Sequence, residues 1–124
     1  MSSHNAIIQD LCGSGAQSKL FWKAVRAIAT EEGWLRDDLR LAKRGFQPDA
    51  FVVDRDTKVI TLFEVEHHHL LNDRKLSMLA HFWWDLDCEG WCVELVRVNN
   101  RGEWTESNLM AEWYRMLAPN AAKG

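Results

Sequence analysis

The chain has 124 residues, of which 47% are hydrophobic, and this favours one domain with a substantial buried core. Its net charge of −3 gives no overall basic signal for nucleic acid, although a local patch can still bind it. No apolar run approaches the roughly 20 residues that span a bilayer, so we expect no membrane partner.

Targeting signals and cysteine content indicate the compartment. The N-terminal sequence lacks the basic start and the long apolar stretch of a signal peptide. Three cysteines are an odd count, which is typical of a reducing compartment. We therefore expect a cytoplasmic protein, with a lead-in over residues 1–14, one domain over 15–118 and a tail over 119–124.

The first predicted element is a helix over residues 15–32. Ser14 offers an N-cap, Gln17 completes a capping box, and Gly33 is a natural end. Its apolar residues recur at helical spacing, and they are Leu20, Phe21, Ala24, Val25 and Ile28. Residues 34–47 fit a short strand or a helical turn equally well.

A hairpin follows, because two apolar runs flank the turn-forming stretch DRDTK. We expect its strands over residues 50–54 and 59–66. Asn72 then caps a second helix, which ends at Glu89-Gly90.

The last two predicted elements are a strand over residues 91–98 and a helix over 106–117. Thr105 is the expected N-cap of this helix, and Pro119 follows its end. Met110, Trp113 and Leu117 match one packing face. The order is helix, uncertain strand, two strands, helix, strand, helix. It predicts an α/β fold with a mixed sheet of about four strands flanked by helices.

Three carboxylates should meet at one end of this sheet. Glu64 and Glu66 are two residues apart on a strand, so they point to the same face. Asp49 begins the strand that pairs with the end of theirs. Such a cluster repels itself, and a hard cation such as Mg²⁺ relieves the repulsion. A bound Mg²⁺ can polarise a phosphoryl oxygen and activate water, which suits phosphodiester hydrolysis.

The spacing of these residues resembles a known family. Pro48-Asp49, fourteen intervening residues and then Glu64-Val65-Glu66 resemble the signature of the PD-(D/E)XK nuclease superfamily, which has a restriction-endonuclease-like fold. The order of elements from about residue 15 to 100 also looks like that family's core. The resemblance implies that Asp49, Glu64 and the Val65 carbonyl hold Mg²⁺ or Mn²⁺ in a nuclease.

Glu66 departs from the family pattern, which has lysine at this position. Some restriction endonucleases of the family carry Glu there, so Glu66 is a candidate metal ligand or catalytic base. Lys75 begins the next helix and is a candidate to supply the missing positive charge. The other interpretation is that catalysis has been lost.

Further candidates surround this motif. His68 is the best of three consecutive histidines for an accessory role as ligand, phosphate contact or general acid, although a polar turn explains all three. The most basic stretch precedes Asp49 and offers phosphate contacts, and its residues are Arg36, Arg40, Lys43 and Arg44. A solvated surface explains them as well.

Cysteines and tryptophans are weaker signals. Cys88 and Cys92 are too few and too loosely spaced for zinc, so we expect buried free thiols. Trp83 and Trp84 lie on adjacent helix faces, so one should be core and the other exposed.

The preferred hypothesis is an Mg²⁺-dependent endonuclease, a hydrolase that binds and cuts DNA. A phage or mobile-element origin suits the family resemblance, and the compartment would then be the host cytoplasm. The alternative is a catalytically inactive nuclease-fold module that binds protein or nucleic acid. A third hypothesis is an acidic inhibitor that occupies a partner's nucleic-acid groove. So small a nuclease would act as a homodimer or beside a larger protein partner.

Overall fold

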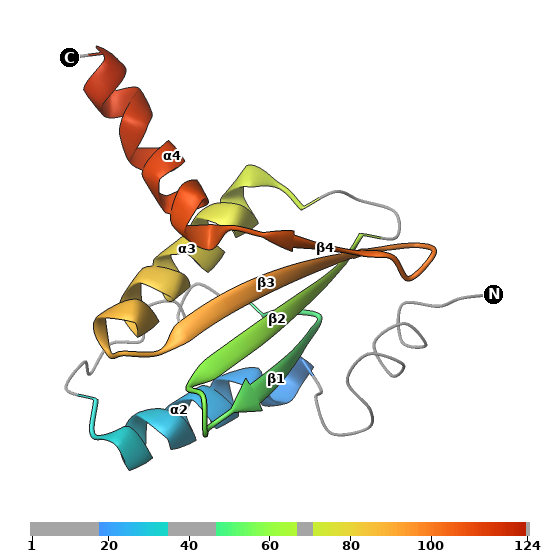
Figure 1. Cartoon of the computed structure of the whole chain (residues 1–124), viewed down its shortest axis with the longest axis vertical. Helices are drawn as coiled ribbons and strands as arrows, with labels where there is room; N and C mark the ends of the chain where they lie inside the picture. Colours follow the sequence, from blue (N-terminus) through green and yellow to red (C-terminus); the bar gives the residue numbers. More distant parts are fainter. Residues whose placement is uncertain (1–17, 35–46, 67–70, 124) are drawn as a thin grey trace.

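A computed structural model describes residues 18–34, 47–66 and 71–123 (Figure 1). Its helices are η1 (Ser18–Leu20), α2 (Phe21–Glu32), α3 (Asp73–Cys88) and α4 (Leu109–Lys123). Its strands are β1 (Ala50–Asp54), β2 (Val59–Glu66), β3 (Cys92–Asn99) and β4 (Trp104–Ser107). No helix of these described residues has the length and apolarity to cross a membrane.

The four strands form one mixed sheet in the order β1-β2-β3-β4. β1 and β2 pair antiparallel as the predicted hairpin, and β3 lies parallel to β2 after the α3 crossover. β4 pairs antiparallel with the outer edge of β3. The predicted α/β class with a mixed sheet is therefore confirmed. The carboxyl ends of β2 and β3 and the start of β1 lie at the same end of the sheet (Figure 1).

The C-terminal part of the prediction was wrong in two places. A fourth strand, β4, occupies residues predicted to cap or begin the last helix, and Thr105 lies within it. The helix begins instead at Leu109, where Asn108 Oδ1 accepts a hydrogen bond of 3.1 Å from the Ala111 N–H. The helix also continues past Pro119, whose fixed φ is compatible with a helix although its ring nitrogen donates no hydrogen bond. The alternative strand within 34–47 falls almost wholly outside the described residues.

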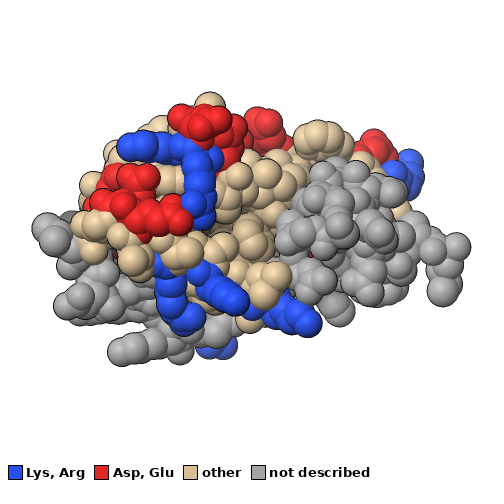
Figure 2. All heavy atoms as spheres, turned by 90° about the horizontal axis from the view of Figure 1, so that it is seen from below, with Lys and Arg blue, Asp and Glu red and all other residues tan. Residues whose placement is uncertain are grey.

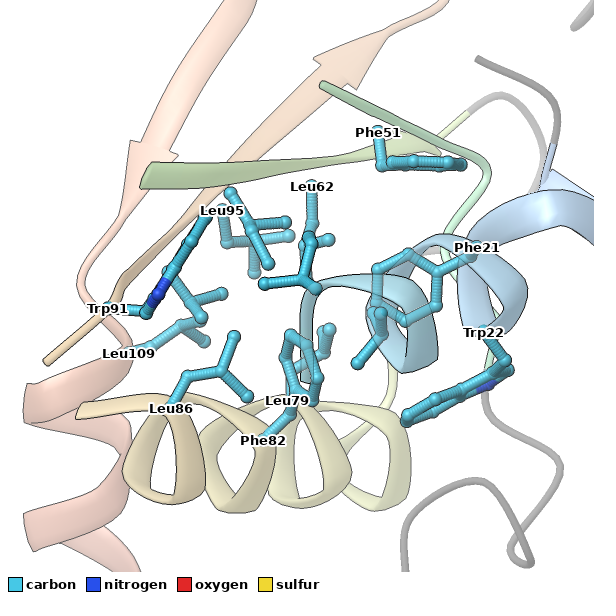
Figure 3. Packing of buried hydrophobic residues seen from close by; sticks show 14 of the residues in the cluster. Phe21, Trp22, Phe51, Leu62, Leu79, Phe82, Leu86, Trp91, Leu95 and Leu109 are labelled. Atoms are coloured by element: carbon cyan, nitrogen blue, oxygen red, sulfur yellow. The ribbon is translucent and has the colours of Figure 1, made fainter. Parts of the chain in front are cut away.

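The main core lies between one face of the sheet and the helices α2 and α3. Phe21 is at its centre, with edge-to-face ring contacts to Trp22, Phe51 and Phe82 at centroid distances of 5.0, 5.3 and 5.4 Å (Figure 3). Leucines of α3 and β3, together with Trp91 just before β3, extend this core to the start of α4. A smaller cluster occupies the other face of the sheet, and its members are Ala50, Phe63, Val65, Val96 and Val98.

Two predicted helix boundaries are confirmed by their caps. Gly33 adopts a left-handed conformation with φ 68°, and its N–H reaches the carbonyls of the last turn of α2. Asn72 Oδ1 accepts a hydrogen bond of 2.8 Å from the Lys75 N–H and so caps α3. This second cap fixes the first turn of α3, which carries the Lys75 side chain.

The predicted packing face of α4 is rotated. Over residues 109–117, where burial is described, Leu109 is buried, whereas Met110, Tyr114 and Leu117 are exposed. Trp113 is partly buried and stacks on Trp84, with ring centroids 5.1 Å apart. The C-terminal half of α4 projects away from the sheet (Figure 1).

Candidate functional site

Asp49 and Glu64 face each other at the end of the β1–β2 hairpin. The Asp49 N–H donates to the Phe63 carbonyl at 3.1 Å, which extends the ladder beyond the Ala50–Phe63 pair. Asp49 is therefore opposite Glu64, and both lie on the face that carries the main core. The pairing of β1 with β2 thus brings these two acids together, as the sequence predicted.

The Asp49 carboxylate takes the place of a backbone acceptor just before β1 begins. Its Oδ2 accepts a hydrogen bond of 2.7 Å from the Val65 N–H. The N–H and the C=O of one strand residue point to the same edge, so the Val65 carbonyl is directed to the same side as Asp49. This hydrogen bond fixes the orientation of Asp49 against the strand that carries Glu64.

Glu64 is a buried carboxyl group, with 4% of its surface exposed. Lys75 Nζ donates to its Oε2 at 2.9 Å. Its Oε1 is buried and accepts no hydrogen bond from a described donor, although the carboxyl groups of Asp49 and Glu64 interact. The pKa of Glu64 is raised to about 8, first by burial and then by the charge of Asp49, whereas Lys75 acts to lower it.

Glu66 lies on the same face but is bound differently. Its Oε2 accepts a hydrogen bond of 3.1 Å from the Leu71 N–H, beside the N-cap of α3. Its Oε1 lies 3.2 Å from Arg97 Nε in an ion pair. Both oxygens thus hold the end of β2 to its neighbours. The described residues contain no group of three His, Cys, Asp or Glu side chains placed to hold a metal.

Arg97 was missed as a site residue. It is the β3 partner of Glu64 in the parallel register and lies beside the acids. The alternation in the stretch VELVRVN places Arg97 on the face of Leu95, but the register of two parallel strands cannot be read from a sequence. The predicted strand–helix–strand crossover did indicate that the strand carrying Arg97 would lie next to β2.

Several predicted site residues fall outside the described part of the chain. They are His68 and the four basic residues Arg36, Arg40, Lys43 and Arg44. Their proposed roles as accessory group and phosphate contacts stay predictions.

The burial predicted for the two free cysteines was wrong, and the tryptophan prediction was right. Cys88 and Cys92 are free but exposed, because one ends α3 and the other begins β3 on its outward face. Trp83 is half-buried against the core, whereas 38% of Trp84 is exposed. Trp113 covers one face of the Trp84 ring, so only the other face is left for a partner.

Comparison of this chain with models of protein families, with curated proteins and with solved structures gave no match. The residues of the site and their geometry are therefore the basis for its proposed activity.

Proposed function

We propose that this chain is a metal-dependent endonuclease of the restriction-endonuclease-like type, which hydrolyses phosphodiester bonds in DNA. The observation that carries the proposal is the placement of Asp49 opposite Glu64 with the Lys75 ammonium on Glu64. The order α2, β1, β2, α3, β3 supports it, since this is the order on which the resemblance depends. The site also lies at the carboxyl ends of two parallel strands, where α/β sheets commonly bind ligands.

The donor set fits Mg²⁺ or Mn²⁺. Asp49, Glu64 and the Val65 carbonyl would supply the hard oxygen ligands that these ions prefer. The buried Oε1 of Glu64, to which no described group donates a hydrogen bond, is an acceptor of the kind that a cation satisfies. When bound, the cation would polarise a phosphoryl oxygen and activate a water molecule.

Lys75 would take the place of the lysine that the motif lacks. Its ammonium comes from the first turn of α3 and is held against Glu64. A fixed positive charge there would stabilise the negative charge that develops on the phosphoryl oxygens during hydrolysis. Arg97 adds a second cation at the same end of the sheet.

A second candidate function is a catalytically inactive module that keeps the fold. Glu64 is almost fully buried, and Glu66 is engaged by the Leu71 N–H and by Arg97. These observations favour acids that stabilise the end of the sheet. Such a module would bind a protein or a nucleic acid without cutting it.

Cleavage assays separate the two candidates. Plasmid, linear duplex, single-stranded and branched DNA, and RNA, would be incubated with Mg²⁺, Mn²⁺ or EDTA. The matched variant is Asp49→Asn, because its amide oxygen can still accept the hydrogen bond from the Val65 N–H. We expect metal-dependent nicking of plasmid that falls by at least about 100-fold in Asp49→Asn. A wild type that cuts none of these substrates would favour the inactive module.

The expectation of a homodimer or a larger protein partner stays a prediction. A domain with one such site would cut both strands of a duplex by pairing with a second copy.

A further inference from the structure

We infer that a stripe of three basic residues on η1 and α2 binds the phosphate backbone of the substrate and directs it to the Asp49–Glu64 site. The basic stripe consists of Lys19, Lys23 and Arg26. This inference rests on the proposed function, because the site defines what the stripe would serve.

The stripe follows from helical spacing. The three residues lie at positions i, i+4 and i+7 on one side of the helix, and all three are exposed. The opposite side of the helix packs into the core through Phe21, Trp22, Val25 and Ile28. The basic stripe is therefore held rigidly on the outside of the fold.

Within the described part of the chain, no acidic side chain neutralises the charge of the stripe. None of its three side chains forms an ion pair with a described residue, whereas Arg55 and Lys58, at the other end of α2, pair with Glu31 and Glu32. Figure 2 views this side of the molecule. Basic atoms line the lower edge of the described surface without acidic neighbours, and basic and acidic atoms meet at the upper left.

The position of the stripe connects it to the site. It begins in the turn before Phe21, whose ring contacts Phe51 at 5.3 Å, and Phe51 is two residues beyond Asp49. In Figure 1 the start of α2 lies toward the end of the sheet where β1 begins. A strand bound along the stripe would thus lead to the end of the sheet that carries the carboxylates.

The length of the stripe suits a nucleic-acid strand. Seven residues at 1.5 Å each span about 10 Å, which matches the rise of about three nucleotides in one strand of duplex DNA. Contacts to phosphates carry no sequence information, so this binding should be independent of sequence. An anionic membrane is a poorer fit, because a surface-bound helix inserts its apolar face and that of α2 is buried in the core.

Equilibrium binding in EDTA tests the stripe without cleavage. Fluorescence anisotropy would be measured with labelled duplex and single-stranded oligonucleotides of unrelated sequence. The stripe variant is Lys19→Gln, Lys23→Gln and Arg26→Gln. The control variant, Arg55→Gln, Arg101→Gln and Arg115→Gln, removes as much charge from exposed arginines that are already ion-paired. Gln suits a helix, and Arg55 and Arg101 lie in exposed turns, so both variants should fold, and circular dichroism would verify this.

We expect the stripe variant to bind at least about tenfold more weakly and the control to stay within about twofold of the wild type. The slope of log K against log salt should become shallower by about 3 in the stripe variant, one unit for each lost phosphate contact. Equal weakening in both variants would overturn the inference. So would a wild type that binds anionic phosphatidylserine vesicles and no nucleic acid.

The outcomes distinguish this inference from the proposed function. Stripe-dependent binding without any metal-dependent cleavage would refute the nuclease and leave the basic stripe as a nucleic-acid surface. Cleavage that needs Asp49 but is unchanged in the stripe variant would refute the stripe and leave the nuclease.

Discussion

At the scale of single residues, Glu64 is the side chain on which the proposed function depends most. A carboxyl group that is almost fully buried favours its neutral form, and the nearby charge of Asp49 favours it further. Lys75 stabilises the charged form through one oxygen only. In the metal-free protein, Glu64 therefore favours its protonated form. A second cation beside it would favour the charged form.

The stability of the metal-free protein should depend on this proton. The pKa of Glu64 is about 8 in the folded chain and 4.5 in an ordinary glutamate, so folding strengthens proton binding. The resulting stabilisation is complete below the lower value and is lost as the pH rises through the higher one. In EDTA, urea denaturation should show wild-type stability falling between about pH 5.5 and 9, and falling less in Glu64→Gln. Parallel curves for the two proteins would contradict the raised pKa.

Lys75 should stabilise the fold mainly at high pH. Lys75→Met leaves the Glu64 carboxylate without its ammonium partner, and we expect a loss of about 1–3 kcal/mol near pH 9. The loss should be smaller near pH 6, where Glu64 is protonated. The matched control is Arg74→Met, because Arg74 is the exposed neighbour of Lys75. Equal losses at both pH values would mean that Lys75 acts through packing alone.

Glu66 provides a test of which acids serve catalysis. Glu66→Gln keeps an acceptor for the Leu71 N–H and removes only the charge that faces Arg97. If Glu66 holds the Leu71 backbone rather than the metal, cleavage should fall by less than about tenfold in Glu66→Gln. In Glu64→Gln it should fall by about 100-fold or more. Equal loss in both variants would instead assign Glu66 to the metal, as the motif comparison suggested.

At the scale of elements, the cap of α3 links folding to the site. Asn72 closes the first turn of the helix, and that turn carries Lys75 to Glu64. Glu66, at the end of β2, also accepts a hydrogen bond from the Leu71 N–H, just before this cap. The position of the ammonium thus depends on two hydrogen bonds outside the acid pair.

Asn72→Ala should cost about 1 kcal/mol in the free energy of unfolding and should also reduce cleavage, because the first turn of α3 would fray. Asn72→Asp should restore both, since its carboxylate accepts the same hydrogen bond. Asn108→Ala is the matched control, because it removes the equivalent cap from α4. It should lower stability by a similar amount and leave cleavage unchanged in a plasmid-nicking assay.

The elements that could be predicted are those with strong local signals. The DRDTK turn, the Asn72 cap and the Gly33 end each have a local chemical cause, and the structure has all three where they were expected. β4 was missed because its four residues are largely exposed and lack the apolar alternation of a strand. Its pairing with β3 is a tertiary effect, and the same effect displaced the start of α4.

The candidate site was predictable to the same extent. Asp49 and Glu64 meet because hairpin pairing is local, so their spacing in the sequence was enough. The placement of Arg97 and its ion pair with Glu66 depend on the register between parallel strands separated by a helix, which no local pattern specifies.

At the scale of the whole molecule, the basic side chains are distributed unevenly. The chain is acidic overall. Its basic stripe nevertheless begins toward the end of the sheet that holds the acids, and Lys75 and Arg97 form ion pairs with Glu64 and Glu66 at that end. The opposite arrangement, with acids alone at this end, would repel a polyanion. This distribution is what a metal-dependent enzyme acting on a phosphate backbone requires.

Calorimetric titration with Mn²⁺ at about pH 8 tests the central claim most directly, because it measures the metal site without assuming a substrate. We predict binding of one Mn²⁺ per chain by the wild type, weakened at least about tenfold in Asp49→Asn and in Glu64→Gln, and retained in Asn108→Ala. Absence of binding by the wild type, or equal affinity in Asp49→Asn, would contradict the assignment of Asp49 and Glu64 as a metal centre.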